Sequence, residues 1–244
     1  MTVHNWYLYS PDDDPQLRPD ADVLLVSDPQ FSNLPNPQIQ TSELAEICNV
    51  GHALKLEMFL LMDQLLDEDQ LQKLRTYLPW IEAIGFDGVM FADVGVGYEI
   101  LTKGLRLKSV YDPGDLISSS GEAHQFLKQG FDLVVPSRNL SFDQALLIAQ
   151  KHKKRILFDL RRFRVLAASK RKLLSDYFEN KKIKKQADTY WMIEEKRKSG
   201  LEIKESDAGT FVVGRLPSPE VCYSTMRSYG AHFLLDIPQK GERK

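Results

Sequence analysis

Charged side chains recur in this sequence directly after runs of apolar residues that have the pattern of buried strands. They are Asp28, Asp63, Asp93, Asp112, Arg138 and Arg161. Carboxylates that face a guanidinium group could hold a small anionic molecule or exchange protons with it, because neighbouring charges shift one another's pKa values. We single out Asp63, Asp93 and Arg138 as candidate catalytic residues. Taken singly, each could instead cap a helix or lie solvated at the surface.

A basic segment is the second feature with functional meaning. Between Lys151 and Lys185 there are fourteen Lys or Arg residues against three acids, a local excess of +11, whereas the whole chain has a net charge of −2. Lys and Arg supply the phosphate contacts that dominate nucleic-acid affinity, and interleaved aromatic residues such as Trp191 can stack on bases. We predict RNA contacts by Arg161, Arg162, Arg164, Lys170, Arg171, Lys172, Lys181 and Lys182. A solvated helix face with its aromatic residues in the core remains the alternative.

Several familiar chemistries lack their residues. Cys48 and Cys222 have no Cys-x-x-Cys spacing and no histidine close in sequence, so we expect no metal site, no iron–sulfur cluster and no resident cofactor. Neither a Gly-x-Ser-x-Gly elbow nor a His-Glu-x-x-His motif occurs. The glycines of residues 93–97 suggest a phosphate loop, but the third glycine and the Lys-Ser/Thr pair are missing, which favours a structural turn.

The elements that would bring the charged residues together follow a repeated local pattern. A helical stretch ends at a glycine, a short turn with an aspartate or a small residue follows, and an apolar run comes next. Gly85 precedes the run 88–93 in this way, and Gly130 precedes the run 133–136. Glycine is what a left-handed helix C-cap requires, and an apolar run without alternation is typical of a strand buried on both faces.

Strands and helices alternate along most of the chain. Helical spacing covers residues 42–52, 67–83, 119–129 and 141–151, and strands are expected at 6–9, 23–26, 56–61, 88–93, 107–111, 133–136, 155–160 and 233–236. This alternation implies right-handed crossovers and a parallel sheet, either open or closed. Seven strands before residue 165 and one or two after it favour an α/β fold of the TIM-like (β/α) barrel type, which could be incomplete or distorted. Its strand ends would place Asp63, Asp93 and Arg138 on one rim.

Length and composition predict one domain over residues 1–244. The chain has 244 residues, of which 43% are apolar and 27% charged, which is enough for one sizeable core. Residues 176–220 interrupt the repeat with a Lys-rich stretch and an extended pair at 201–205 and 210–213, so we expect an excursion from the barrel there. No apolar run long enough to span a membrane and no signal peptide is evident, which predicts a cytoplasmic protein without a membrane partner.

A family resemblance rests mainly on Ser169-Lys170-Arg171-Lys172-Leu173-Leu174-Ser175-Asp176-Tyr177-Phe178. This segment resembles the Ser-(Gly or Lys)-Arg-x-x-Leu-(Ser or Gly)-Asn-Tyr motif of the collagenase-like peptidase family U32, with Ser169, Arg171, Ser175 and Tyr177 as the motif residues. The stretches 86–93, 134–141 and 201–210 are also similar to family segments. The resemblance implies a barrel fold. It further implies either peptidase activity or the RNA role of members that support prephenate-dependent hydroxylation of wobble uridine in tRNA, or of a cytidine in ribosomal RNA.

The chain departs from the family pattern at positions that matter for function. Aligned from Ser169, the family's His-Gly falls on Arg161-Arg162 and its two cysteines fall on Val165 and Lys172. Whether the chain is an enzyme is therefore left open, and three hypotheses follow. The first is an RNA-binding component of tRNA wobble-uridine hydroxylation, with an anionic metabolite such as prephenate near Arg138. The second is a collagenase-like protease or hydrolase. The third is a non-catalytic partner that forms a hetero-oligomer with an intact U32 paralogue.

Overall fold

The computed structural model describes residues 4–11, 20–160, 163–193, 201–215 and 223–235. It divides the chain into two compact units. The barrel unit comprises Met1–Leu160 and Pro219–Lys244, and the insert unit comprises Arg161–Ser218. The excursion expected over residues 176–220 thus begins earlier in the chain and forms a compact unit with its own sheet.

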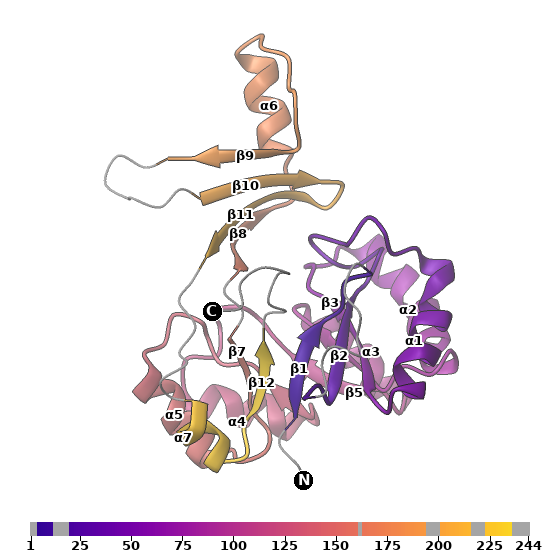
Figure 1. Ribbon diagram of the computed structural model, residues 1–244, viewed down its shortest axis with the longest axis vertical. Coiled ribbons are helices and arrows are strands. Elements are labelled where there is room, and N and C mark those ends of the chain that lie inside the picture. The colour runs from indigo at the N-terminus through magenta and orange to yellow at the C-terminus, as the bar shows by residue number, and fades with distance from the viewer. Residues whose placement is uncertain (1–3, 12–19, 161–162, 194–200, 216–222, 236–244) are drawn as a thin grey trace. The chain divides into compact units, whose positions relative to one another are not determined.

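Eight parallel strands, counted over the described residues, form the sheet of the barrel unit (Figure 1). They are β1 (Asn5–Leu8), β2 (Val23–Ser27), β3 (Glu57–Met62), β4 (Gly88–Phe91), β5 (Lys108–Tyr111), β6 (Leu133–Val134), β7 (Leu157–Asp159) and β12 (His232–Leu235). They pair in the order β6-β5-β4-β3-β2-β1-β12-β7. An isolated parallel bridge between Val134 and Ile156 joins the two ends of this sheet. The result is a nearly closed TIM-like (β/α) barrel with a weak seam between β6 and β7, which confirms the predicted fold class.

Helices lie outside the sheet, and five of them connect the successive strands from β2 to β7 (Figure 1). The helices are α1 (Leu44–Ala53), α2 (Glu68–Ala83), α3 (Val94–Lys103), α4 (Ser120–Gln129), α5 (Phe142–Lys151) and α7 (Tyr223–Ser228), and the short 3-10 helix η2 (Thr41–Glu43) leads into α1. The four predicted helices are present. The interpretation of residues 93–97 as a turn was wrong, because α3 starts there. A side chain at Gly97 would collide with the rings of Phe91 and Phe131, so the glycine permits close helix packing.

Alternate residues of the strands go to two apolar clusters. Leu24 and Val26 of β2 join the cluster beneath the helices. Val23 and Leu25 join Trp6 and other residues in a second cluster that lines the inner face of the sheet. Burial on both faces explains why these strands are apolar without alternation, and each fully buried aliphatic side chain contributes about 1.5–3 kcal/mol.

Several strands are preceded by a turn that contains an aspartate, and this aspartate binds the neighbouring strand of the sheet, which comes earlier in the chain. In three of these turns a carboxylate oxygen accepts the amide N–H of the neighbouring strand at 2.8 Å, as Asp22 does from Asn5, Asp87 from Met58 and Asp132 from Ser109. The preceding glycines Gly85 and Gly130 have φ angles of +107° and +114°, as their predicted place at the ends of helices requires. The repeated sequence pattern is therefore a device that sets strand register at the amino end of the barrel.

The insert unit has an antiparallel sheet in the order β8-β11-β10-β9. Its elements are β8 (Phe163–Ser169), α6 (Leu173–Asn180), β9 (Thr189–Met192), β10 (Leu201–Ser206) and β11 (Gly209–Arg215). The hairpin of β10 and β11 confirms the predicted extended pair. Strands β8 and β9 were not predicted. Strand β8 pairs with β11, which lies far away in the sequence, so no local turn signal marks that pairing.

Candidate functional site

The predicted catalytic residues follow the carboxyl ends of strands in one parallel barrel. Asp63 comes directly after β3, Asp93 follows β4 and Arg138 follows β6. Because the strands run parallel, these positions belong to the same end of the barrel, which is where barrel enzymes carry their active sites. The location of all three residues at one end of the barrel agrees with the prediction from sequence. Their catalytic role stays a prediction.

Two of the three residues organise loops at this rim. Asp93 is the N-cap of α3, where its Oδ1 accepts from the Gly95 amide at 2.8 Å and its Oδ2 accepts from the Leu66 amide at 2.8 Å. Asp63 binds Asn33, which donates its backbone N–H to Oδ1 at 2.7 Å and its Nδ2 to the Asp63 carbonyl at 2.6 Å. Asp93 therefore caps a helix, which is the alternative given above for a single charged residue. Asp63 connects the loop after β2 to the loop after β3.

Arg138 is the centre of an ion triad whose two carboxylates are buried. Its Nη2 donates to Asp112 Oδ2 at 2.6 Å and its Nε donates to Asp159 Oδ2 at 3.1 Å. The exposed fractions of the three side chains are 18% for Arg138, 7% for Asp112 and 1% for Asp159. Asp112 follows β5 and Asp159 ends β7, so Arg138 links the carboxyl ends of β5, β6 and β7. This link crosses the seam between β6 and β7, where the described residues have one isolated backbone bridge.

Two carboxylates share the one guanidinium of this triad. An anionic metabolite such as prephenate at Arg138 would have to compete with both of them, because charge-assisted hydrogen bonds of this length are strong. Asp112 was among the strand-end residues found in the sequence, whereas Asp159 was missed because it was placed inside a predicted strand. Its signal was a lone carboxylate at the end of an apolar run.

Asp28 is a buried rim carboxylate whose charge is sensitive to pH near neutrality. Burial raises its pKa to about 6, although hydrogen bonds from Tyr77, Gln30 and Phe31 act in the opposite direction. The donors are the Tyr77 hydroxyl at 2.7 Å and the amides of Gln30 at 2.7 Å and Phe31 at 2.8 Å. A carboxyl group with a pKa near 6 can exchange protons at physiological pH. Because Asp28 is fully buried, we interpret its main role as structural: it holds the loop after β2 against α2.

The predicted RNA-binding residues divide into three groups. Lys170, Arg171, Lys181 and Lys182 are exposed on the insert unit. Lys172 is partly engaged, because its Nζ donates to the Ser206 carbonyl and lies 3.5 Å from Asp207 Oδ1. Arg161 and Arg162 lie outside the described residues, and Arg164 is placed in β8 opposite Gly214.

The U32-like motif of residues 169–178 forms a turn and the helix α6. The Ser169 hydroxyl accepts from the Arg171 amide at 3.2 Å. Ser175 binds the buried Glu205 of β10 through its hydroxyl at 2.5 Å and its amide at 3.3 Å. Tyr177 is 54% exposed. The Arg171 carbonyl accepts from the Thr210 hydroxyl at 2.8 Å, and the Tyr177 ring lies 5.4 Å from the Phe178 ring, so all four motif residues have structural contacts.

Glu205 binds the first turn of α6 to the sheet, together with Thr210, and sequence reasoning did not single it out. Its carboxylate, 3% exposed, also accepts from Lys185 Nζ at 2.7 Å and from the Thr210 hydroxyl at 3.0 Å. Burial alone would raise the pKa of Glu205, but hydrogen bonds from Lys185, Ser175 and Thr210 lower it to about 2. The similarity of residues 201–210 to a family segment was the signal that could have led to it.

The described residues lack two other kinds of feature. No group of three or more His, Cys, Asp or Glu side chains within them could hold a metal ion. None of the helices in the described ranges is long and apolar enough to cross a membrane.

A nearly closed barrel of parallel strands, with helices outside and charged side chains at the carboxyl ends, places the protein in the class of (β/α) barrels. Residues 16–213 match the model of peptidase family U32, and the chain belongs to this family. The resemblance found in the sequence is thereby confirmed.

Solved structures agree with this class. The structure of the U32 peptidase Mk0906 matches with a TM-score of 0.60 and 18% sequence identity, over 98% of this chain and 94% of that chain. A chitinase, RmChi1 from Rhizomucor miehei, matches with a TM-score of 0.52 and 8% identity, over 97% of this chain and 95% of that chain. Identities this low show a shared fold alone. A search of curated proteins finds no match.

Proposed function

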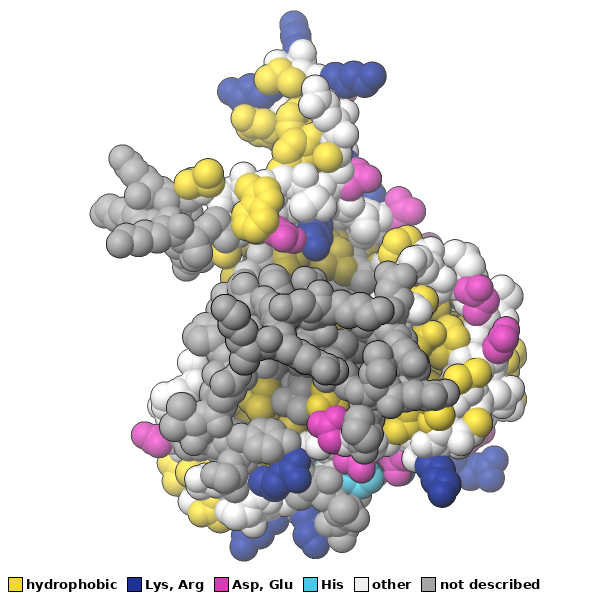
Figure 2. Space-filling model, in the orientation of Figure 1, with side chains coloured by type: hydrophobic (Ala, Val, Ile, Leu, Met, Phe, Trp, Pro, Cys, Tyr) yellow, Lys and Arg dark blue, Asp and Glu magenta, His cyan; other side chains and the backbone are white. Residues whose placement is uncertain are grey.

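We propose that this U32 protein is an RNA-binding component of tRNA modification that supports hydroxylation of a wobble uridine, with the insert unit as its RNA-binding surface. The observation that carries the proposal is a set of exposed cationic side chains on that unit, namely Lys170, Arg171, Lys181, Lys182 and Lys184. Figure 2 shows Lys and Arg side chains around the end of the unit that α6 forms. Such charges supply the sequence-independent part of RNA affinity.

The spacing of these cations suits a nucleic-acid backbone. Lys170 and Arg171 precede α6, whereas Lys181, Lys182 and Lys184 follow it. A helix of this length extends about 12 Å, so the two groups can contact phosphates several nucleotides apart. Lysines at a helix C-terminus also stabilise the helix dipole, but that effect does not account for the pair before α6.

Exposed aromatic side chains accompany the cations. Tyr177 on α6 is 54% exposed and Trp191 on β9 is 66% exposed. Aromatic faces beside a basic surface are what single-stranded RNA stacks on. The Glu205 contacts hold α6 on the sheet, so Tyr177 is presented on a rigid element.

The peptidase alternative has weaker support. Burial raises the pKa of the Cys48 thiol to about 11, and the charge of Asp87 adds to this effect. A thiol in that environment is a poor nucleophile at neutral pH, because the thiolate is the reactive form. The third hypothesis, a non-catalytic partner of a U32 paralogue, is supported by the arginines at positions 161 and 162, where the family has His-Gly.

A filter-binding titration with tRNA over a range of salt concentrations tests RNA binding. The variant Lys181→Gln/Lys182→Gln should bind roughly tenfold more weakly than the wild type, and the log–log salt slope should fall by about 0.7–0.9 for each lost phosphate contact. The control is Lys73→Gln/Lys103→Gln, which removes two exposed lysines of the barrel unit. No affinity of the wild type at low salt, or equal losses in both variants, would contradict the proposal.

The modification step is tested in cells that lack the protein. Mass spectrometry of tRNA nucleosides should show loss of the hydroxylated wobble uridine, and restoration by the wild type but not by Lys181→Gln/Lys182→Gln. Unchanged hydroxylation in cells without the protein would refute the role in tRNA modification. Cleavage of casein or collagen by the purified protein would favour the peptidase alternative, and co-purification with an intact U32 paralogue would favour the partner hypothesis.

A further inference from the structure

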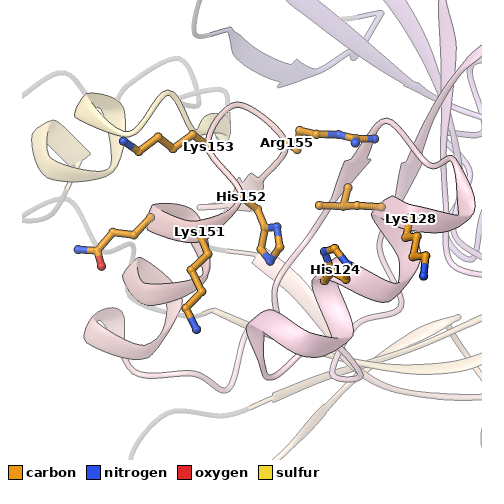
Figure 3. Close-up of a pocket in the computed structure, with 8 residues that line it drawn as sticks. His124, Lys128, Lys151, His152, Lys153 and Arg155 are labelled. Atoms are coloured by element: carbon orange, nitrogen blue, oxygen red, sulfur yellow. The ribbon is translucent and has the colours of Figure 1, made fainter.

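A basic hollow lies on the barrel unit where α4 and α5 end. Its volume is about 450 Å³, and the charged and imidazole side chains that line it are His124, Lys128, Lys151, His152, Lys153 and Arg155 (Figure 3). Arg155 stands just before β7, so the hollow is at the amino end of the strands, opposite to the rim that carries Arg138. It is thus separate from the triad.

The charge of this hollow is of one sign. Four of its lining residues, Lys128, Lys151, Lys153 and Arg155, are permanent cations, and no carboxylate is among the residues that line it. Within the described part of the chain, none of the three lysines forms a salt bridge. Helix dipoles attract Lys128 and Lys151, which lie in the last turns of α4 and α5, but they do not explain Lys153 and Arg155, which follow α5.

Two of the lining side chains are held in place by backbone carbonyls. The Arg155 guanidinium donates from Nε to the Asp132 carbonyl at 3.0 Å and from Nη2 to the Phe131 carbonyl. The His152 Nε2 lies 2.9 Å from the Ser120 carbonyl, which can only accept a hydrogen bond, so this nitrogen carries a proton. The centroid of the His124 ring is 6.0 Å from that of His152. Figure 3 shows the two rings near each other, with the side chains of Lys128, Lys151 and Lys153 extending away from them.

We propose that this hollow binds a ligand with more than one phosphate group. Its volume is in the range of small-molecule sites, about 300–1,000 Å³, but its lining is cationic where such sites are mostly apolar. A polyanion is the ligand that a lining with four cations and no carboxylate attracts, and Arg and Lys are the side chains that recognise phosphate. A free diphosphate and consecutive phosphodiesters of RNA share this chemistry. The proposal concerns the barrel unit and does not depend on RNA binding by the insert unit.

Calorimetric titration of the full chain with inorganic pyrophosphate is the test. The wild type should bind, Lys128→Gln/Lys153→Gln should bind at least roughly tenfold more weakly, and the control Lys73→Gln/Lys103→Gln should stay within about twofold of the wild type. All four lysines are exposed, so none of these variants should affect folding. No binding of pyrophosphate by the wild type, or an equal loss in both variants, would overturn the proposal.

A competition arm identifies the source of the phosphate. A short single-stranded oligoribonucleotide that displaces pyrophosphate from the wild type supports RNA as the ligand, whereas binding of pyrophosphate without displacement supports a free phosphate compound. Failure of this site is distinguishable from failure of the proposed function. Lys181→Gln/Lys182→Gln should keep its pyrophosphate affinity while its tRNA affinity falls.

Discussion

Replacement of Arg138 by methionine should destabilise the barrel unit strongly. Methionine has a similar length and no charge, so Asp112 and Asp159 would lose the guanidinium that neutralises them. Both carboxylates are at least nine-tenths buried, at 7% and 1% exposure. The same change removes a side-chain link across the seam between β6 and β7 at the carboxyl end, where the described residues provide one isolated backbone bridge.

The expected cost follows from the two contacts. Each hydrogen bond to a charged partner is worth about 1.5–3 kcal/mol, and removing one member of a buried ion pair typically costs about 3–5 kcal/mol. We therefore expect Arg138→Met to lower the free energy of unfolding by about 3–5 kcal/mol at pH 7. Without the guanidinium, the two buried carboxyls take up protons more readily in the folded state than in the unfolded state. The loss should consequently shrink as the pH falls to about 5.

Urea denaturation at pH 5 and pH 7 measures both effects. The control is Arg106→Met, since Arg106 pairs with Glu82 at 3.5 Å and is 91% exposed, so its replacement should cost less than about 1 kcal/mol. Adding Asp112→Asn and Asp159→Asn to Arg138→Met should recover much of the loss, because the two buried carboxylates that lost the guanidinium are then replaced by neutral side chains. A loss no greater than that of the control, or one independent of pH, would refute the reasoning.

Three further predictions concern titrating groups. Because the folded pKa of Asp28 is raised to about 6 from 3.8, stability should fall as the pH rises from about 4 to about 6, by at most about 3 kcal/mol, and Asp28→Asn should remove this slope in urea titrations. The pKa of Glu205 is lowered to about 2, so its stabilisation is present above pH 4.5 and lost as the pH falls towards 2. At pH 7, Glu205→Gln should accelerate amide hydrogen exchange at Leu174 and Ser175, and unchanged exchange would contradict the anchoring role. Cys48, with a pKa of about 11, should be alkylated by iodoacetamide at pH 8 at least roughly a hundredfold more slowly in the native protein than in urea, as followed by mass spectrometry.

The barrel was predictable from sequence because its signals are local. Each glycine that ends a helix and each aspartate that follows it are close in the chain, and Gly85 with Asp87 shows how the pair ends α2 and fixes β4 against β3. The start of helix α3 at Val94 escaped this reasoning because Gly95 and Gly97 are poor helix formers. The aromatic rings against which Gly97 packs come from other elements.

The candidate site was less predictable because its contacts are long-range. Strand-end position was enough to propose Arg138 and Asp112, yet nothing in the sequence shows that one guanidinium is shared by two carboxylates. Glu205 was missed for the same reason, since its partner Ser175 lies thirty residues earlier in the chain. Exposed lysines such as Lys181, which need no partner, were found from composition alone.

Ultraviolet cross-linking of bound tRNA, followed by mass spectrometry of the attached peptides, tests RNA binding by the insert unit most directly. We expect cross-links in peptides of residues 170–191, with Tyr177 and Trp191 as the attachment points, and their loss in Lys181→Gln/Lys182→Gln. Cross-links confined to peptides of the barrel unit, or none at all under conditions in which tRNA is bound, would contradict it.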